Sequence, residues 1–447
     1  MAKAKKSKLT IEDALVPVEE QPYEIPENWC WTFVNAVCIF ENGYAFKSDK
    51  FGEEGTPVIR ISNIQENEVD LDTCVYTSEE DIEERFVVKK GDLLIAMSGA
   101  TTGKNGIYLS DERAYLNQRV GNIKVRNSEV LLLRFRDFYI MSKQEEILNS
   151  AYGGAQPNIS STKIGEMLFP LPPLAEQKRI VEQIENMFAK LDEAKEKAQE
   201  SLDGFQTRID SILHKAFSGD LSVVWRNENG ISSVRENVIF RDILDVRDGT
   251  HDSPQYYDEG YPLVTSKNLK NGCITDKDIK YISKEDFDQI NQRSKVDVGD
   301  ILFAMIGTIG NPVVIEDEPN YAIKNVALFK NKGKVNPYFI KYYLESREVR
   351  DKMQKEAKGT TQKFVSLGYL RDFPIAIPSD LEQEYIVKKL DELLSKELQA
   401  VSIIEEVIEQ IDLMKKSVLA KAFRGELGTN ESEDESSIEL LKSILEK

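Results

Sequence analysis

The fold is decided by residues 171–221, LPPLAEQKRIVEQIENMFAKLDEAKEKAQESLDGFQTRIDSILHKAFSGDL. Pro172 and Pro173 stop the preceding segment and favour a helix start directly after them. No proline follows as far as Ala216, and apolar residues recur at spacings of three and four. The pattern predicts one helix, roughly 60 Å long, with a narrow coiled-coil seam. The predicted seam residues are Ile180, Ile184, Met187, Leu191, Ala194, Ala198, Leu202, Phe205, Ile209 and Ile212, with one extra four-residue step from Ala198 to Leu202.

A second copy of this segment lies 206 residues further on. Pro172 corresponds to Pro378 in IPSDLEQEYIVKKL, and Phe217 of KAFSGDL corresponds to Phe423 of KAFRGEL. We expect Gly219 to close the first helix and Gly425 to close the second. Because each helix has only one narrow apolar stripe, the two stripes are best buried against each other, which makes the pair a spacer of fixed length. The second stripe consists of Ile386, Leu390, Leu394, Leu398, Val401, Ile404, Ile408, Ile411, Met414 and Val418.

The repeat also extends upstream of the helices. GDLLIAMSGAT at Gly91 matches GDILFAMIGTI at Gly299, and PVIRISNI at Pro57 matches PLVTSKNL at Pro262. This period is too long for a solenoid, whose units have about 20–50 residues. VIRISNI, DLLIAMSG and VGNIKV are typical of strands, and residues 131–151 of a helix. The predicted fold class is α+β: two similar α+β domains separated and joined by two long helices.

The expected divisions follow from these patterns. They are an N-terminal arm (1–28) with a short amphipathic piece from Leu9 to Val16, a first α+β domain (29–170), a first helical region (171–220), a linker (221–234), a second α+β domain (235–375), a second helical region (376–427) and an acidic tail (428–447), in which NESEDESSIE is expected to be solvated.

The bulk composition is that of an ordinary globular protein. The 447 residues exceed what one core holds, and 41% are hydrophobic and 30% charged. No uncharged apolar run approaches the ~18 residues that span a bilayer, and the basic start lacks the apolar stretch of a secretory signal. The four cysteines show no CxxC spacing. We therefore expect a cytoplasmic protein with reduced thiols and no membrane partner.

The net charge of −19 restricts the possible partners. A protein that holds DNA unaided usually has an excess of lysine and arginine, because neutralising phosphates supplies much of its affinity. This chain therefore either binds no nucleic acid or binds it within an assembly whose other subunits supply positive charge.

The sequence argues against catalysis on this chain. SGATTGKN departs from a Walker A loop, because Gly99 and Gly103 enclose three residues and Asn105 follows Lys104. A GxGxxG fingerprint and the motifs of amino-methyltransferases, restriction nucleases and helicase motors are absent. With only His214 and His251, a histidine-based metal site or triad is nearly excluded.

Polar clusters occupy matched places in the two domains. GYAFKSDKF at Gly43 matches GTHDSPQYY at Gly249, and LNQRV at Leu116 matches AIKNV at Ala322. The framework residues are kept while the polar residues change. Arginine and lysine suit guanine edges, and asparagine and glutamine suit adenine edges. Two different half-site readers would have this pattern; the alternative is surface loops with no shared task.

In this order and duplicated, several motifs resemble the specificity subunits of Type I restriction–modification systems. The resemblance covers about Pro26 to Leu427. Its motifs are YEIPENWCW, LPPLAEQKRIVEQIE, GGAQPNIS, GTHDSP with VTSKNL, and the helix ends KAFSGDL and KAFRGEL.

The resemblance implies a non-catalytic DNA specificity subunit. Each of two target-recognition domains would read one half of a split sequence in double-stranded DNA. The two helices would form an antiparallel coiled coil that sets the gap, giving a pseudo-twofold frame. Two methylation subunits would dock on the helices and bring S-adenosylmethionine, and restriction subunits would bring ATP and Mg²⁺ chemistry. No cofactor or metal is expected on this chain.

The polar residues of the matched clusters and of the neighbouring strand ends are the predicted DNA contacts. In the first domain they are Tyr44, Lys47, Ser48, Arg60, Ser98, Thr101, Thr102, Lys104, Asn105, Gln118, Arg119, Gln156 and Asn158. In the second domain they are His251, Asp252, Ser253, Tyr256, Lys267, Thr308, Asn311, Lys324, Asn325, Gln362 and Lys363.

Two other function classes stay open at this point. The acidity permits a coiled-coil scaffold or a DNA-mimicking regulator, and the charge of the matched loops separates these from a DNA reader. A fused methyltransferase is disfavoured by the missing catalytic motifs.

Overall fold

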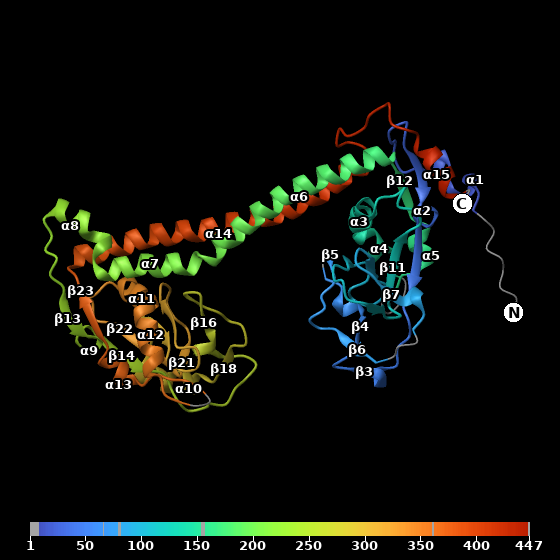
Figure 1. Ribbon diagram of the computed structural model, residues 1–447. Coiled ribbons are helices and arrows are strands. Elements are labelled where there is room, and N and C mark those ends of the chain that lie inside the picture. The colour runs from blue at the N-terminus through green and yellow to red at the C-terminus, as the bar shows by residue number, and fades with distance from the viewer. Residues whose placement is uncertain (1–8, 66, 79–81, 153–156, 360–361, 446–447) are drawn as a thin grey trace. The chain divides into compact units, whose positions relative to one another are not determined.

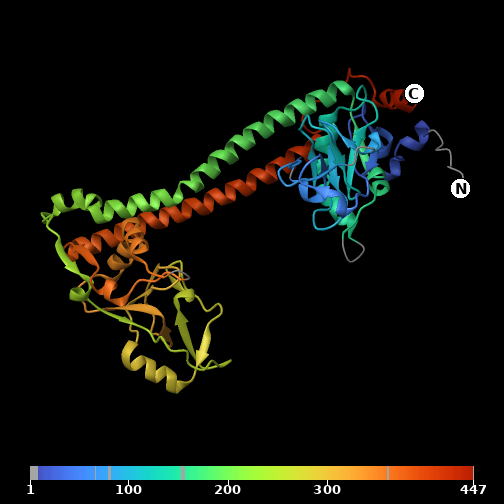
Figure 2. The same cartoon turned by 60° about the horizontal axis from the view of Figure 1, so that its bottom comes forward.

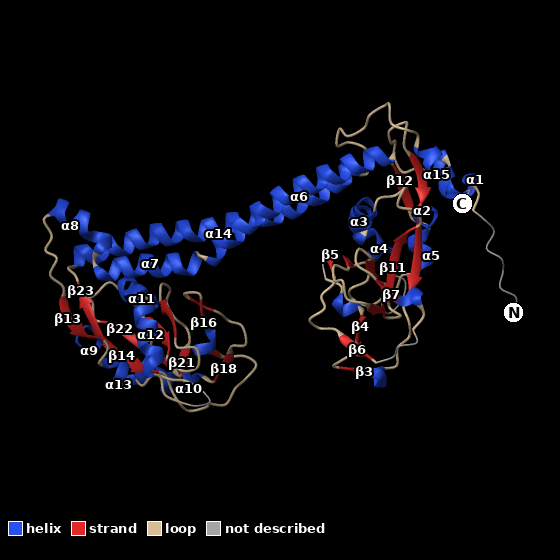
Figure 3. Ribbon diagram, in the orientation of Figure 1, coloured by secondary structure: helices blue, strands red, loops and turns tan. Residues whose placement is uncertain are grey.

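The computed structural model describes residues 9–65, 67–78, 82–152, 157–359 and 362–445. It contains two compact units, unit 1 with residues 1–197 and 407–447, and unit 2 with residues 198–406 (Figure 1). Helices and strands occur in both units, which confirms the α+β prediction (Figure 3). None of the helices in the described ranges is long and apolar enough to cross a bilayer.

Unit 1 is built on two five-stranded sheets and one strand pair. The pair joins β1 (Cys30–Phe33) to β12 (Leu168–Leu171) in antiparallel register. One sheet has the order β2 (Cys38–Asn42), β11 (Val120–Val125), β8 (Leu93–Ala96), β9 (Asn105–Ile107) and β5 (Asn67–Glu68). The other has the order β3 (Phe51–Gly52), β6 (Val75–Thr77), β4 (Thr56–Ile59), β10 (Ala114–Leu116) and β7 (Val87–Val88). The helices are α2 (Val34–Val37), α3 (Leu133–Ser142), α4 (Gln144–Ala151) and α5 (Ser161–Gly165).

Unit 2 repeats this plan with its own strands. The pair joins β13 (Glu236–Ile239) to β23 (Pro374–Ile377), and β16 (Leu269–Lys270) pairs with β17 (Cys273–Ile274). The larger sheet has the order β14 (Leu244–Asp248), β22 (Val326–Asn331), β19 (Ile301–Ala304) and β20 (Gly310–Val314). The smaller has the order β18 (Lys280–Ile282), β15 (Tyr261–Thr265) and β21 (Ala322–Lys324). The helices are α9 (Phe240–Ile243), α10 (Lys284–Ser294), α11 (Pro337–Glu345), α12 (Arg347–Glu356) and α13 (Leu367–Arg371).

Strand pairing confirms that the sequence repeat is a structural repeat. In unit 1, β11 is antiparallel to β2 and β10 is parallel to β4. In unit 2, β22 is antiparallel to β14 and β21 is parallel to β15. The same pairings therefore place the same loops at the same edge of each unit.

The first long helix is interrupted, which corrects the prediction of one continuous helix. It consists of α6 (Leu174–Asp203) and α7 (Phe205–Ser218), separated by Gly204. Glycine weakens a helix interior by about 1 kcal/mol relative to alanine, and Gly204 lies next to the predicted four-residue step. The Arg208 guanidinium bridges the break by donating to the Ser201 carbonyl oxygen at 3.0 Å. Gly219, at φ 95°, closes α7 as predicted.

The second long helix, α14 (Asp380–Ala422), is antiparallel to the first. In unit 1 the Lys195 ammonium contacts the Asp412 carboxylate at 2.7 Å, and Lys415 pairs with Asp192. In unit 2, α7 lies beside α14 in both views (Figure 2), and the Arg208 Nε atom contacts a Glu397 carboxylate oxygen at 2.8 Å. Residue numbers fall along α14 as they rise along α6 and α7, so the two long helices run in opposite directions.

The apolar seam is buried near its two ends and at Ile411, and is otherwise mostly half-buried. Ile180, Ile184, Ile386, Leu390 and Ile411 are buried. The half-buried seam residues are Met187, Leu191, Ala198, Leu202, Phe205, Ile209, Ile212, Leu394, Val401, Ile404, Ile408 and Val418.

Three predicted seam residues lie outside the seam. Leu398 is 62% exposed, and Met414 and Ala194 are exposed as well. The neighbouring positions Glu397 and Lys415 face the partner helix instead, because their charges pair with Arg208 and Asp192 across it. An ion pair across the helices therefore replaces an apolar contact at two turns.

A buried glutamine fixes the start of each long helix to its domain. Gln177 Nε2 donates to the Val130 carbonyl at 2.8 Å, and its Oε1 accepts from the Leu132 amide at 2.9 Å. Gln383, 206 residues later, accepts from the Asn336 amide at 2.9 Å. Side chains that satisfy buried backbone groups hold both elements in one geometry.

A buried glutamate precedes each glutamine but has different partners in the two units. Glu382 Oε1 accepts from Ser222 Oγ at 2.6 Å, Arg226 Nη1 at 2.7 Å and Arg235 Nη2 at 3.3 Å. Glu176 accepts from neutral donors: Trp29 Nε1 at 2.6 Å, Asn430 Nδ2 at 2.7 Å and Thr429 Oγ1 at 3.2 Å.

Acid is expected to destabilise unit 2 through Glu382. Burial alone would raise the pKa of this carboxyl, but the hydrogen bonds from Ser222 and Arg226 outweigh burial and hold its pKa below the usual 4.5. A carboxyl with a lowered folded-state pKa stabilises the fold above its unfolded pKa, and this contribution is lost as the pH falls through the folded pKa. We expect Glu382→Gln to flatten the fall in the unfolding free energy of unit 2 below about pH 4.5. An unchanged acid profile in denaturant titrations would contradict this assignment.

Helices lie in the three segments predicted as arm, linker and tail. In the expected arm, α1 (Ile11–Ala14) packs on the domain, and Thr32 Oγ1 donates to the Ala14 carbonyl at 2.6 Å. In the expected acidic tail, α15 (Ser437–Leu445) contacts α1, and Arg179 pairs with Asp434 (Figure 1). In the expected linker, α8 (Val223–Asn229) packs on α14. Apolar side chains within these polar stretches supply the packing.

Truncating Leu441 is expected to loosen both ends of the chain. Its side chain is fully buried in the core of unit 1. Leu441→Ala should lower the unfolding free energy of unit 1 by about 2–4 kcal/mol. Ile438→Ala, at an exposed position of the same helix, is the matched control and should change it by less than about 0.5 kcal/mol. Hydrogen exchange of α1 and α15 measures the difference, and equal protection in both variants would refute it.

Candidate nucleic-acid interfaces

Polar segments from four places converge on one edge of unit 1. We call residues 42–44, 97–99, 117–119 and 157–159 the first reading surface. The Met97 amide donates to the Arg119 carbonyl at 3.0 Å, and the Ile159 amide donates to the Met97 carbonyl at 2.9 Å. The Tyr44 amide donates to the Leu116 carbonyl at 2.7 Å. The ends of β2, β8 and β11 thus hold this surface in place.

The first reading surface has a polar hollow of about 550 Å³. Its lining residues are Asn42, Met97, Ser98, Gln118, Arg119, Pro157, Asn158 and Ile159. The Ser98 hydroxyl is buried and has no hydrogen-bond partner among the described residues. An unsatisfied hydroxyl at the edge of a hollow is available to a ligand.

Unit 2 builds a second reading surface in the same way. It comprises residues 248–257, 305–308, 324–325 and 362–365. The Asn325 amide donates to the Thr250 carbonyl at 3.1 Å, and the Val365 amide donates to the Met305 carbonyl at 3.0 Å.

A glycine permits the close approach on which each surface depends. A Cβ atom on Gly43 would lie 2.1 Å from the Asn117 carbonyl oxygen, and one on Gly249 would lie 2.3 Å from the Ile323 carbonyl oxygen. Any larger residue would separate the strand end from the turn that carries Gln118 or Lys324.

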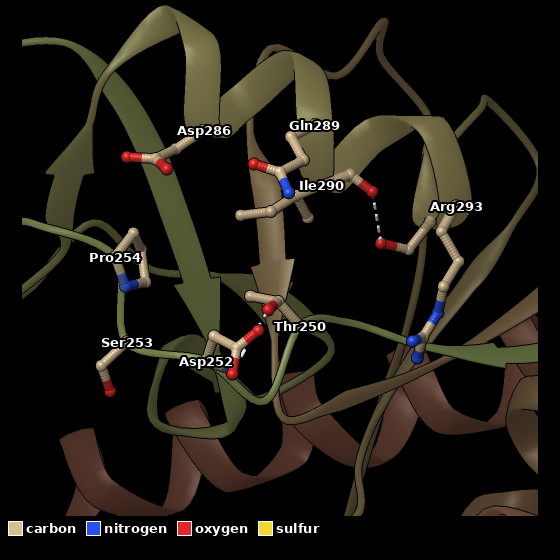
Figure 4. A pocket seen from close by; sticks show the side chains of 9 residues that line it. Thr250, Asp252, Ser253, Pro254, Asp286, Gln289, Ile290 and Arg293 are labelled. Atoms are coloured by element: carbon tan, nitrogen blue, oxygen red, sulfur yellow. Dashed lines mark hydrogen bonds between the residues drawn. The ribbon is translucent and has the colours of Figure 1, made fainter.

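The second reading surface borders a pocket of about 220 Å³. Side chains of α10, among them Gln289 and Arg293, face loop residues 250–254 across it (Figure 4). At the place of α10, the described residues of unit 1 form only a short 3-10 helix, Glu84–Phe86. The pocket is therefore a difference between the two surfaces.

A charged network fixes the loop of the second surface. His251 Nε2 lies 2.9 Å from an Asp248 carboxylate oxygen, and His251 Nδ1 lies 2.8 Å from Asn325 Oδ1. Arg293 pairs with the other Asp248 oxygen. Lys324 Nζ donates to Ser253 Oγ at 2.6 Å.

Three of the predicted DNA contacts are buried, and their contact with DNA stays a prediction. Thr102 Oγ1 donates to the Gly99 carbonyl at 2.7 Å, and Asn105 Nδ2 donates to the Gly103 carbonyl at 3.2 Å. Lys324 is buried beneath Ser253. Thr102 Oγ1, Asn105 Nδ2 and Lys324 Nζ thus donate within their own domain.

The other predicted contacts have free surface. The exposed ones are Tyr44, Lys47, Ser48, Gln118, Arg119, Asn158, His251, Asp252, Ser253, Tyr256, Lys267, Thr308, Gln362 and Lys363. The half-exposed ones are Arg60, Ser98, Thr101, Lys104, Asn311 and Asn325. Gln156 lies outside the described residues. DNA contact by each of these residues stays a prediction.

Several cations among the predicted contacts, on these surfaces or on neighbouring loops, have no carboxylate partner in the described part of the chain. In unit 1 these are Lys47, Lys104 and Arg119. In unit 2 they are Lys267 and Lys363. Unpaired surface cations are available to phosphate groups.

These surfaces also contain residues that were not among the predicted contacts, including Asn42, Asp248, Ile306 and Phe364. The repeat itself carried part of the signal, because Asn42 and Asp248 are 206 residues apart, as are Asn158 and Phe364. Ile306 and Phe364 are apolar, and an apolar side chain in a loop has no sequence pattern that marks it as a DNA contact.

Comparisons with known proteins agree on one family. The sequence model described as "Type I restriction modification DNA specificity domain" matches residues 26–202 and 236–410. The chain is 26% identical over 423 residues to the Type I restriction enzyme EcoBI specificity subunit of Escherichia coli, covering 90% of this chain and 87% of the relative. It is 24% identical over 421 residues to the EcoKI specificity subunit of Escherichia coli strain K12, covering 90% of each.

Solved structures show the same fold. A chain from a structure described as "Structural basis underlying complex assembly and conformational transition of the type I R-M system" aligns with a TM-score of 0.69 and 19% identity, covering 91% of this chain and 100% of that chain. The HsdS subunit of Thermoanaerobacter tengcongensis aligns with a TM-score of 0.60 and 18% identity, covering 92% and 100%.

Proposed function

Because this chain belongs to the family of Type I restriction–modification DNA specificity subunits, a non-catalytic component of those enzymes, we propose that it reads a bipartite DNA target with one half-site per unit. The first reading surface would contact one half-site and the second would contact the other. Each would approach the base edges in the major groove.

One observation carries this proposal: the two surfaces share a backbone frame and differ in their side chains. The end of the equivalent strand and the turn after it carry the exposed Gln118 and Arg119 in unit 1, and a buried Lys324 beside a half-exposed Asn325 in unit 2. A protein that bound a symmetric target would have no need for this difference. Unlike side chains on a shared frame favour an asymmetric, two-part sequence.

The long helices are proposed to set the gap and to dock two methylation subunits. Ile403 and Val407, four residues apart on α14, are exposed apolar side chains on one helix face. The partners would supply what this chain lacks: S-adenosylmethionine on the methylation subunits, and ATP with Mg²⁺ on the restriction subunits. The chemistry would belong to those partners. The cytoplasmic location expected from the sequence stays a prediction.

The charge of the first reading surface favours a DNA reader over a DNA mimic. None of the described residues that line its hollow is a carboxylate, and Arg119 is among them. The acidity of the chain as a whole is compatible with this reading if the partner subunits share the neutralisation of phosphates.

Removing the Arg119 charge tests the contact with DNA. In the complex with its methylation subunits, Arg119→Ala should weaken binding to the DNA motif that the complex recognises. The expected loss is about 1–3 kcal/mol if the guanidinium reads a base. If it contacts phosphate, the salt slope of the binding constant should fall by about one. Lys90→Ala, which removes a cation paired with Asp111, is the control and should change neither. Unchanged affinity, base preference and salt slope would remove Arg119 from the interface.

A further inference from the structure

One pair of side chains occupies the same backbone position in each reading surface. In unit 1, Ser98 and Asn158 form an isolated antiparallel bridge, and in unit 2 Ile306 and Phe364 form the same bridge. The flanking hydrogen bonds also match. The Gly99 amide donates to the Pro157 carbonyl at 3.0 Å, and the Gly307 amide donates to the Lys363 carbonyl at 2.8 Å. The two pairs are therefore structurally equivalent.

The chemistry of the two pairs is opposite. In unit 1 the Ser98 hydroxyl and the Asn158 amide offer donors and acceptors beside the polar hollow, and the hydroxyl lacks a partner among the described residues. In unit 2 both side chains are apolar. Phe364 is 38% exposed although it is a large hydrophobic residue, and Ile306 beside it is half-buried. An exposed aromatic ring at a place where the other unit is polar calls for a ligand with an apolar group.

The surroundings of Phe364 restrict what that ligand can be. Lys363 and Gln362, the two residues before it, are exposed and polar, and they suit phosphate oxygens and base edges. Within the major groove of DNA the one apolar group at a base edge is the 5-methyl group of thymine.

We propose that Ile306 and Phe364 are specificity determinants that contact a thymine 5-methyl group in the half-site of unit 2. The matched pair Ser98 and Asn158 makes hydrogen bonds to a base edge in the other half-site. The inference rests on the proposed function and deepens it, because it assigns one base type to one position of the target.

Replacing thymine by deoxyuridine tests the contact, because it removes the methyl group and leaves base pairing intact. The target motif is first identified by mapping the methylated sites in the genome. The full chain in complex with its methylation subunits is then titrated with duplexes that carry this motif. In each duplex, deoxyuridine replaces thymine at one position. At one thymine of the second half-site we expect about fourfold weaker binding, which is the loss of ~0.8 kcal/mol for one buried methyl group.

The variant Phe364→Ala should remove this sensitivity, so that the thymine and deoxyuridine duplexes bind equally. Phe364→Leu keeps an apolar side chain and should retain at least half of the effect. The thermal unfolding of both variants is measured as well. If Phe364→Ala unfolds at the same temperature as Phe364→Leu, its loss of sensitivity comes from the lost contact and not from unfolding. Asn158→Ala is the matched control: it should alter discrimination in the first half-site only and leave the deoxyuridine effect intact.

The proposal is overturned if the second half-site contains no thymine, if none of its thymines responds to deoxyuridine, or if Phe364→Ala keeps the full response. Failure of the proposed function has a different signature. In that case the wild-type complex would not prefer the motif duplex over a scrambled duplex, whether the motif contains thymine or deoxyuridine.

Discussion

Replacing Glu382 by alanine is expected to lower the unfolding free energy of unit 2 by about 3–5 kcal/mol. The carboxylate is buried, and one of its oxygens, Oε1, accepts from Ser222, Arg226 and Arg235. Alanine would leave both guanidinium groups without their shared counter-charge. A buried charge without a partner destabilises the fold by more than the intact ion pair stabilises it. Removing one partner therefore lowers the unfolding free energy far more than removing both.

Two comparisons isolate the charge. Glu382→Gln keeps an oxygen in place of Oε1 and puts an amide nitrogen where Oε2 has no hydrogen-bond partner in the described structure, so its loss should be smaller. Glu176→Ala removes the matched carboxylate of unit 1, whose donors are neutral, and should cost about 1–3 kcal/mol. Hydrogen exchange of α8 and of the first turns of α14 measures the effect within unit 2. Equal losses in Glu382→Ala and Glu176→Ala would show that the two arginines contribute nothing specific.

Shortening both long helices by one matched heptad is expected to change the gap of the DNA target and nothing else. Deleting residues 190–196 together with 411–417 removes both partners of the ion pairs Lys195–Asp412 and Asp192–Lys415. A seven-residue deletion keeps the coiled-coil register. Each helix becomes about 10 Å shorter, which corresponds to about three base pairs.

Binding to the original motif should then fall toward the non-specific level, about 10³-fold or more, because the two half-sites cannot be engaged at once. A duplex with the same half-sites and a shorter gap should recover the affinity. Deleting residues 190–196 alone is the control, since it breaks the pairing of the helices and should destabilise unit 1 without creating a new preference. A double deletion that keeps the original gap would refute the role of the helices as a spacer.

The fold was predictable where its signal is local and repeated. Spacing of apolar residues marked both long helices, and the 206-residue interval marked the duplicated units. The break at Gly204 and the exposure of Leu398 were not predictable in this way. Both depend on Arg208, which bridges the break and pairs with Glu397 across the helix pair. Spacing within one helix contains no information about a charge on another.

The candidate site was predictable in place but only partly in residues. The matched loops do converge on two surfaces, as the repeat indicated. A sequence does not show which polar side chains a loop uses for itself, so the burial of Thr102, Asn105 and Lys324 was not predictable. The exposure of Phe364 was not predictable either, because it depends on how its loop folds. The packing of the acidic tail was not predicted, because it depends on Leu441 and not on the carboxylates that mark the tail in the sequence.

The central claim is that each unit reads its own half of the target. The most direct test replaces residues 29–170 with the corresponding domain of a relative of known specificity and maps methylated sites genome-wide in cells that carry the partner subunits. The account predicts a new motif in which one half-site is that of the donor, while the other half-site and the gap are unchanged. A motif changed in both halves, or in neither, would contradict it.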